Sequence, residues 1–212
     1  MTEIAYKRFT ASLIALWFIF ALAASAMHVF KTATDAPPLP LGLGAILPIL
    51  AFVVWFAASS GFRRFALSLD LKLLTIAQTW RVGGFVFITL YSLRLLPGIF
   101  ALPAGLGDMA IGITAPFVAA KLVNASHRRS FIRWQLLGML DLVVAVTLGT
   151  TAGLLEPRGI PTQLMTVLPL SLIPTFFVPL LFILHIFSIA QARQWREVPS
   201  HNIGQSYSAR LA

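Results

Sequence analysis

Six long apolar runs dominate this sequence. A helix needs about 20 mainly apolar residues to cross a hydrocarbon layer about 30 Å thick. Backbone N–H and C=O groups in lipid must be bonded within the segment, so we expect each run to be helical. The sequence therefore predicts an all-α integral membrane bundle of six transmembrane helices. The predicted spans cover residues 10–30, 41–60, 73–96, 103–120, 135–155 and 164–190.

The composition points the same way and leaves no room for an attached soluble domain. Hydrophobic residues make up 58% of the chain and charged residues only 11%, about half the charged share of an ordinary soluble domain. Residues 1–212 are therefore predicted to form one transmembrane domain. The chain has no cysteine, which excludes disulfides, thiolate metal sites and cysteine nucleophiles.

Basic residues predict the direction of the helices. Of the 16 Lys and Arg residues, 12 fall at the N-terminus, in segments 61–72 and 121–134, or in the C-terminal tail. Loops on the cytoplasmic side of a membrane are enriched in Lys and Arg. Both termini are therefore predicted to be cytoplasmic. The 12 residues are Lys7, Arg8, Arg63, Arg64, Lys72, Lys121, Arg128, Arg129, Arg133, Arg193, Arg196 and Arg210.

The first run has a second interpretation as a cleavable signal peptide. Lys7 and Arg8 precede the apolar stretch, and Ala24-Ser25-Ala26 resembles a cleavage site. Cleavage would leave five spans and an N-terminus outside the cell. The stretch is long for a signal peptide, which favours a retained helix.

A proline motif recurs near the start of every second span. Leu39-Pro40-Leu41, Leu102-Pro103-Ala104 and Leu168-Pro169-Leu170 are each followed by a small residue. Proline is tolerated in the first turn of a helix, and small residues allow helices to approach closely. The motif is compatible with three αα-hairpin repeats, and equally with ordinary membrane helix ends.

Ionisable residues inside the predicted spans are the candidate functional groups, because burying a charge in a bilayer is costly. Arg81 in the third span and Asp141 in the fifth lie at similar depths from the cytoplasmic side. We expect them to form a buried pair, either part of a polar path or a structural link between helices. Arg94 and Asp108 form a second predicted pair at the outer side. Gln78 shares a helix face with Arg81 and adds a polar group.

Other kinds of site find little support. The four histidines His28, His127, His185 and His201 are too dispersed to hold haem or a metal ion, so no cofactor is predicted. Sequence motifs of the P-loop, G-x-S-x-G and H-E-x-x-H classes are absent. The net charge of +9 is explained by basic residues that flank the spans, so we predict the lipid bilayer and no nucleic acid as partner. A homo-oligomer or another membrane subunit is also possible as partner.

The segment from Trp80 to Ala120 carries a resemblance. It contains W-R-V-G-G-F, then L-P-G-I-F-A-L-P-A-G-L-G-D and G-I-T-A-P. This segment resembles a family of uncharacterised bacterial inner-membrane proteins. The resemblance implies a bacterial plasma-membrane location and brings no activity, ligand or catalytic residue.

Three functional hypotheses follow from the sequence. The first is a small permease, channel or transporter subunit with a polar path along the third to fifth helices, lined by Arg81, Asp141, Asp108 and Arg94. The second is a non-catalytic membrane scaffold or accessory subunit in which the ion pairs serve assembly. The third is a membrane enzyme acting on lipid or quinone, with Asp108 or Asp141 as acid or base; only the presence of these carboxylates supports it.

Overall fold

The computed structural model describes residues 3–32 and 38–195, and within them the chain is helical without strands. Six helices are long and apolar enough to cross a membrane, as the sequence predicts. The third and sixth of these each consist of several consecutive segments. The elements are α1 (Glu3–Ala26), α2 (Leu39–Ala58), α3 (Ser60–Leu67), α4 (Leu71–Ile76), η1 (Ala77–Gly84), α5 (Phe85–Ser92), α6 (Gly98–Lys121), η2 (Ala125–His127), α7 (Arg128–Leu155), η3 (Gln163–Thr166), η4 (Ile173–Phe177) and α8 (Val178–Ala192).

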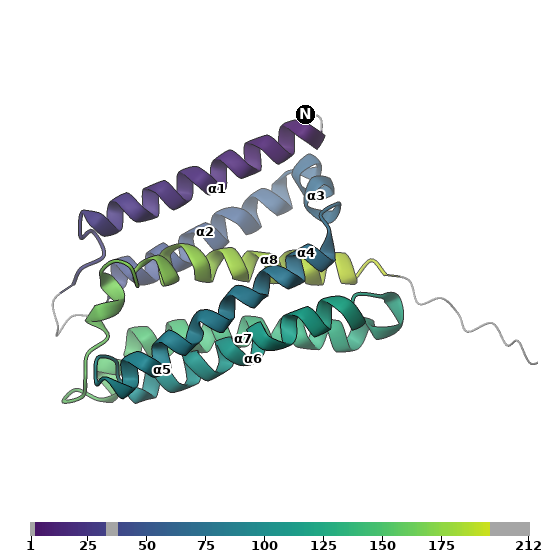
Figure 1. Ribbon diagram of the computed structural model, residues 1–212. Helices are drawn as coiled ribbons and strands as arrows, with labels where there is room; N and C mark the ends of the chain where they lie inside the picture. The colour runs from purple at the N-terminus through teal and green to yellow at the C-terminus, as the bar shows by residue number, and fades with distance from the viewer. Residues whose placement is uncertain (1–2, 33–37, 196–212) are drawn as a thin grey trace, which may run out of the picture.

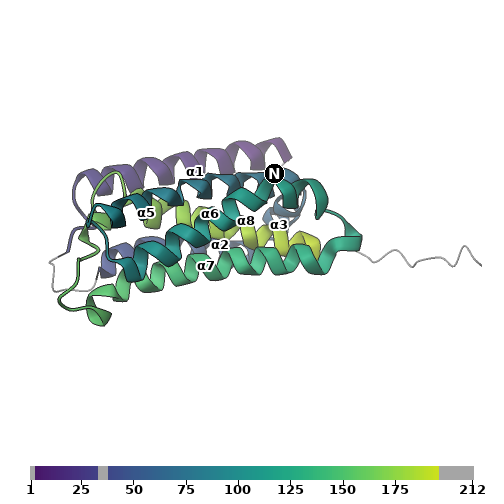
Figure 2. The ribbon, with the colours of Figure 1, turned by 60° about the horizontal axis from the view of Figure 1, so that its bottom comes forward.

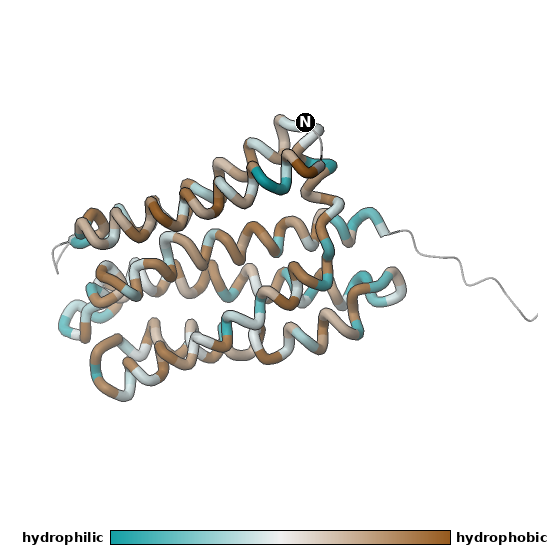
Figure 3. The backbone as a smooth tube through the Cα atoms, turned by 45° about the horizontal axis from the view of Figure 1, so that its top comes forward, coloured by the Kyte–Doolittle hydropathy of each residue, from teal (hydrophilic) through white to brown (hydrophobic). Residues whose placement is uncertain are grey.

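The six long helices lie side by side and turn back at two ends of one bundle (Figures 1 and 2). One end holds the start of α1, the short helix α3, the α6–α7 connection and the end of α8. The opposite end holds the α1–α2, α5–α6 and α7–η4 connections. Hydrophilic residues concentrate at the two ends, and apolar residues follow the helices between them (Figure 3). This distribution suits a protein that crosses a membrane several times.

The connection between the second and third long helices is built from two side-chain caps. The Ser59 hydroxyl accepts a hydrogen bond from the Phe62 N–H at 3.2 Å and begins α3. The Asp70 carboxylate accepts from the N–H groups of Lys72 and Leu73, at 2.8 and 3.3 Å, and begins α4. Such caps satisfy N–H groups that the first turn of a helix leaves unpaired. Gln191 of α8 then donates to the carbonyls of Ala66 and Leu69, both at 3.2 Å, and holds this connection against the bundle.

Several predicted boundaries are wrong, mainly beside prolines. The fourth long helix begins at Gly98, not at 103, because Pro97 with φ −70° and ψ 140° is its N-terminal flanking residue. Pro103 therefore lies inside α6, and the stretch from Leu96 to Pro103 is mostly helix. The sixth begins at Ile173, not at 164, because the separate 3-10 turn η3 precedes it and Val167 after that turn is extended, with φ −121° and ψ 155°. The three prolines of the recurring motif thus occupy different positions relative to their helices.

Two of the long helices change their hydrogen-bonding pattern along their length. Residues Ala77–Gly84 of the third form the 3-10 segment η1, and Ile173–Phe177 of the sixth form the π segment η4. Pro179 has no N–H to donate to the carbonyl of Thr175, and the indole Nε1 of Trp17 donates to that carbonyl at 3.2 Å. This bond holds α1 against the η4–α8 helix.

Ser25, at the predicted cleavage site near the end of α1, is fully buried.

Apolar clusters fill both ends of the bundle interior. Near the α5–α6 connection, Phe87, Leu96 and Phe100 are buried together. Near α3 at the opposite end, Phe62 and Phe187 belong to a second buried cluster. Between these clusters lie the buried polar residues Gln78, Arg81, Gln135 and His185, which mark the candidate site.

Candidate functional site

Arg81 lies at mid-height of the bundle and is almost completely enclosed. It is the eleventh residue of the 22-residue helix Leu71–Ser92, and its side chain is 1% exposed. It belongs to η1, where three residues make one turn. Gln78, Arg81 and Gly84 therefore lie in one line, and all three are buried. The face that Gln78 and Arg81 are predicted to share is thus one continuous buried face of the 3-10 segment, and it continues to Gly84.

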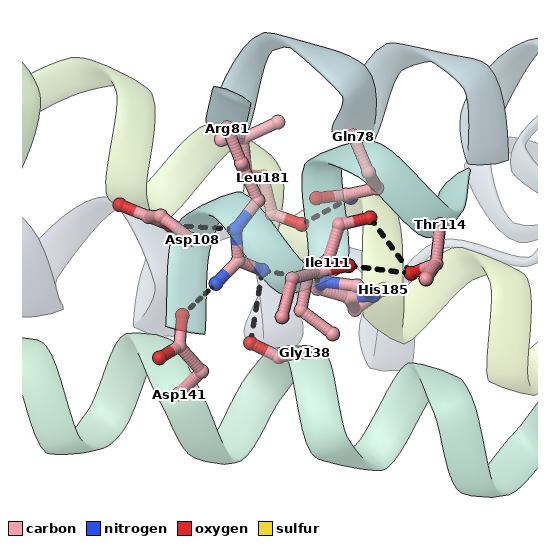
Figure 4. Close-up of polar contacts among 10 residues, drawn as sticks. Gln78, Arg81, Asp108, Ile111, Thr114, Gly138, Asp141, Leu181 and His185 are labelled. Carbon is pink, nitrogen blue, oxygen red and sulfur yellow. Dashed lines mark hydrogen bonds and ion pairs between the residues drawn. The ribbon is translucent and has the colours of Figure 1, made fainter. Parts of the chain in front are cut away.

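Two carboxylates from different helices bind the Arg81 guanidinium (Figure 4). Nε donates to Oδ1 of Asp108 at 2.7 Å, and Nη2 donates to Oδ2 of Asp141. Asp108 is the eleventh of 24 residues in α6, and Asp141 is the fourteenth of 28 in α7. All three charges therefore meet near the midpoint of their helices. Charge-assisted hydrogen bonds of this kind are about twice as strong as neutral ones.

The remaining nitrogen of Arg81 reaches two further acceptors. Nη1 donates to the carbonyl of Gly138 at 3.0 Å and lies 3.2 Å from Nε2 of His185. Because Arg81 can only donate, Nε2 of His185 acts as the acceptor. The proton of the neutral imidazole is then on Nδ1, which donates to Oε1 of Gln135. Arg81 thus connects the third long helix to α6, α7 and α8.

The charges of this cluster do not cancel. Arg81 contributes one positive charge, while Asp108 and Asp141 contribute two negative charges when both are ionised. His185 contributes none in the tautomer that accepts from Arg81. The cluster then carries one excess negative charge at mid-height of an apolar bundle. Such a charge is costly in a low-dielectric interior unless a proton or a cation neutralises it.

Glycines on neighbouring helices make room for each member of the cluster. A Cβ at Gly84 of η1 would lie 2.5 Å from Cβ of Asp108. A Cβ at Gly107 of α6 would overlap the carboxylate of Asp141, and one at Gly138 of α7 would overlap the imidazole of His185. A Cβ at Gly112 would press on the backbone of Arg81 and Val82. The glycine positions therefore let four helices approach closely enough to share one guanidinium.

Two adjoining cavities reach this cluster, and Asp108 lies in the wall of both. The first, of about 190 Å³, lies between η1, α6, α7 and the η4–α8 helix, with Arg81 and Asp108 in its wall. Trp80 stands at its opening, 77% exposed, and stacks on Phe177 with the ring centres 6.4 Å apart. The second cavity, of about 40 Å³, extends toward α2 and the end of the bundle that holds the α1–α2 connection. They share the lining residues Phe87, Asp108, Leu142, Ile173 and Val178.

The two carboxylates differ in their access to these cavities. Oδ1 of Asp108 binds Arg81, and among the described residues no hydrogen bond reaches its Oδ2. Figure 4 shows this second oxygen turned away from the guanidinium. Asp141 lines neither cavity. Asp108 is therefore the carboxylate that a molecule in these cavities can reach.

Of the residues singled out in the sequence, the structure brings four together. Arg81 and Asp141 form an ion pair, and Asp108 joins them. Gln78 lies one turn away, where its Nε2 donates to the Leu181 carbonyl at 3.2 Å. The predicted pairing of Arg94 with Asp108 is wrong: Asp108 lies ten residues inside α6, because the helix begins at Gly98, and it faces Arg81. Arg94 is exposed in the turn after α5, with φ at 57°.

Sequence reasoning missed two members of the cluster, His185 and Gln135. Both are 0% exposed. His185 stands alone within the apolar sequence of α8, and a polar residue inside a membrane span is itself a signal. As a haem ligand it has no partner in the sequence, and the predicted polar path along the third to fifth helices does not include it.

The cluster is organised around Arg81 and not around a metal ion. In residues 3–32 and 38–195, no three side chains of His, Asp or Glu are placed to hold one. The guanidinium itself occupies the centre between the carboxylates and the imidazole.

Comparison with known families gives a match that contains the whole cluster. A family model described as a domain of unknown function, DUF8737, matches residues 36–193, well over half of the chain. The chain belongs to the DUF8737 family. The matched range includes α2 through α8 and leaves α1 outside. No curated protein and no solved structure matches the chain, so any activity must be argued from the site itself.

Proposed function

We propose that this DUF8737 protein is a small membrane permease whose working site is the Arg81–Asp108–Asp141 cluster. One observation carries the proposal: one guanidinium and two carboxylates lie together at the midpoint of their helices, beside a cavity. Substrate and coupling-ion sites of transporters commonly lie near the bilayer midplane, beside interrupted helices. The segments η1 and η4 interrupt the two helices that flank the cavity.

The polar path of this permease differs from the one expected from the sequence. It runs between η1, α6, α7 and the η4–α8 helix, and Arg94 has no part in it. The third, fourth and fifth long helices supply the charged residues, and the sixth supplies His185. A local rearrangement of η1 or η4 would change access to Asp108, since 3-10 and π segments often mark hinges and functional sites.

The orientation is part of the same proposal. Ten described Lys and Arg residues lie at the bundle end that holds the start of α1, and three, Lys31, Arg94 and Arg158, lie at the other. Arg196 and Arg210 lie outside the described residues. This asymmetry supports a cytoplasmic location for the first end. A bacterial plasma membrane is the location that the sequence resemblance suggests.

Charge movement across a reconstituted membrane tests the permease. The protein is placed in proteoliposomes on a solid-supported membrane, and currents are recorded after steps in pH, alkali cations, small organic cations and anions. We expect transient currents that Asp108→Asn and Asp141→Asn each reduce at least tenfold. Asp70→Asn is the matched control, because Asp70 caps α4 far from the cluster and asparagine also caps. Responses equal to those of protein-free liposomes for every step would refute the proposal.

A scaffold is the second candidate, and one observation favours it. The Arg81 side chain is 1% exposed and binds groups on the three long helices that contain α6, α7 and α8, which is what a purely structural link requires. In that case a variant with Arg81→Met, Asp108→Asn and Asp141→Asn should fold and assemble normally. If the protein is a permease, the triple variant should fold but carry no current.

A further inference from the structure

We propose that the cavity beside Asp108 binds a small lipophilic monovalent cation, one that carries a single positive charge and one aromatic or branched apolar group, in exchange for one proton. This inference rests on the proposed permease function and names its substrate class. It joins three independent features: two carboxyl groups that face a single guanidinium, the oxygen of Asp108 that Arg81 does not bind, and the apolar walls of the cavity.

The sign of the ligand follows from the charges around Asp108. The charged or titratable groups packed around it are Arg81 from η1, Asp141 from α7 and, behind Arg81, His185 from α8. Arg81 has donors only, and they point to Asp108, Asp141, Gly138 and His185. An anion would therefore have to displace a carboxylate from Arg81. A cation can instead bind Oδ2 of Asp108 and leave every bond of Arg81 in place.

The apolar character of the ligand follows from the walls. Beyond Arg81 and Asp108, the first cavity is lined by Trp80, Gly83, Gly84, Phe87, Leu142, Ile173, Phe177, Val178 and Leu181. These residues offer no other carboxylate and no hydroxyl to replace the water shell of an alkali ion. Aromatic rings attract cations that carry organic groups, and they cover the apolar part of the ligand. A lipophilic cation can therefore enter at a lower desolvation cost than Na⁺ or K⁺.

Proton exchange keeps the charge of the site constant. In the empty site one proton occupies the carboxylic acid of Asp108, and the cluster is neutral. When the cation binds, the O–H bond of Asp108 breaks and the proton leaves to water. The resulting carboxylate pairs with the cation, so the cluster is neutral again. One cation is bound for each proton released.

Binding by the purified full-length protein in detergent tests the inference. The probe is benzyltrimethylammonium, a permanent cation with one ring, and its charge does not change with pH. We expect its affinity to rise about tenfold per pH unit while Asp108 is protonated, and one proton to be released per bound cation in weakly buffered solution. Benzenesulfonate, an anion with one ring, should bind at least tenfold more weakly.

Variants separate the site from general binding to the apolar surface. Asp108→Asn should abolish the proton release and weaken binding at least tenfold, while Asp70→Asn should bind like the wild type. Because Asp108→Asn could fail to fold, the proton count of the wild-type protein stands as an independent measurement. Binding without proton release, or equal binding of benzenesulfonate, would overturn the inference. If benzyltrimethylammonium does not bind but other steps give currents, the substrate class is wrong and the permease stands.

Discussion

The carboxylate of Asp141 lies directly against the Cα of Gly107, so that any side chain at position 107 would occupy its space. Gly107 immediately precedes Asp108, and α6 therefore contributes both a carboxylate and the space for the carboxylate of the next helix. The same relationship recurs for His185 against Gly138 and for Asp108 against Gly84. Helix packing and the ion cluster are thus built from the same few positions.

Replacing Gly107 with alanine should separate Asp141 from Arg81. The added methyl group overlaps the carboxylate, so either the ion pair breaks or α6 and α7 move apart. We expect a loss of about 2–4 kcal/mol in the free energy of unfolding, from overpacking and a weakened buried pair. Gly153→Ala on α7 is the control, because no atom lies within 4 Å of its added Cβ. Thermal unfolding in detergent should rank Gly107→Ala clearly below Gly153→Ala, and equal stabilities would contradict the predicted contact.

Removing only the guanidinium of Arg81 should lower the free energy of unfolding more than removing all three charges of the cluster together. Arg81→Met leaves two carboxylates facing each other in an apolar interior, and breaking a buried ion pair on one side costs about 3–5 kcal/mol. Adding Asp108→Asn and Asp141→Asn removes both charges, so we expect the triple variant to recover at least half of that loss. Denaturant titration of the three proteins measures this difference. A triple variant less stable than Arg81→Met would show that the carboxylates have other partners.

His185 should contribute to stability through its acceptor nitrogen. His185→Phe keeps a ring of similar size but leaves Nη1 of Arg81 and Oε1 of Gln135 each with one partner fewer. An unpaired buried polar group costs about 1–3 kcal/mol. We expect His185→Phe to be destabilising and His185→Gln, whose amide can both accept and donate, to be closer to the wild type. Equal stability of the two variants would mean that neither hydrogen bond matters.

The sequence predicts the six helices and singles out Arg81, Asp108, Asp141 and Gln78, because these features depend on local composition. The length of an apolar run identifies a membrane span, and an Arg or Asp within that run is recognisable as a candidate functional residue. The partner of Asp108 could not be derived, because it depends on where α6 begins. Pro97 ends the preceding turn and moves the helix start by five residues, so that Asp108 lies at the depth of Arg81 and not of Arg94.

The glycine contacts and the partners of His185 could not be derived from the sequence. A glycine in an apolar helix shows that some neighbour comes close, but not which one. Gly107 and Asp141 are adjacent because α6 and α7 pack against each other in the folded bundle. A histidine within α8 has no visible partner until Arg81 and Gln135 are placed around it.

The direction of the bundle can be tested cleanly because the chain has no cysteine. Ser126→Cys places a thiol in the exposed α6–α7 connection, and Glu156→Cys places one at the exposed end of α7 on the opposite side. Positive residues cluster on the side of Ser126, so we expect that side to face the cytoplasm. In intact spheroplasts, a maleimide that does not cross membranes should label Glu156→Cys and spare Ser126→Cys. Inside-out vesicles should give the reverse pattern. Labelling of Ser126→Cys in intact spheroplasts would invert the bundle and move the cytoplasmic end to the α5–α6 connection.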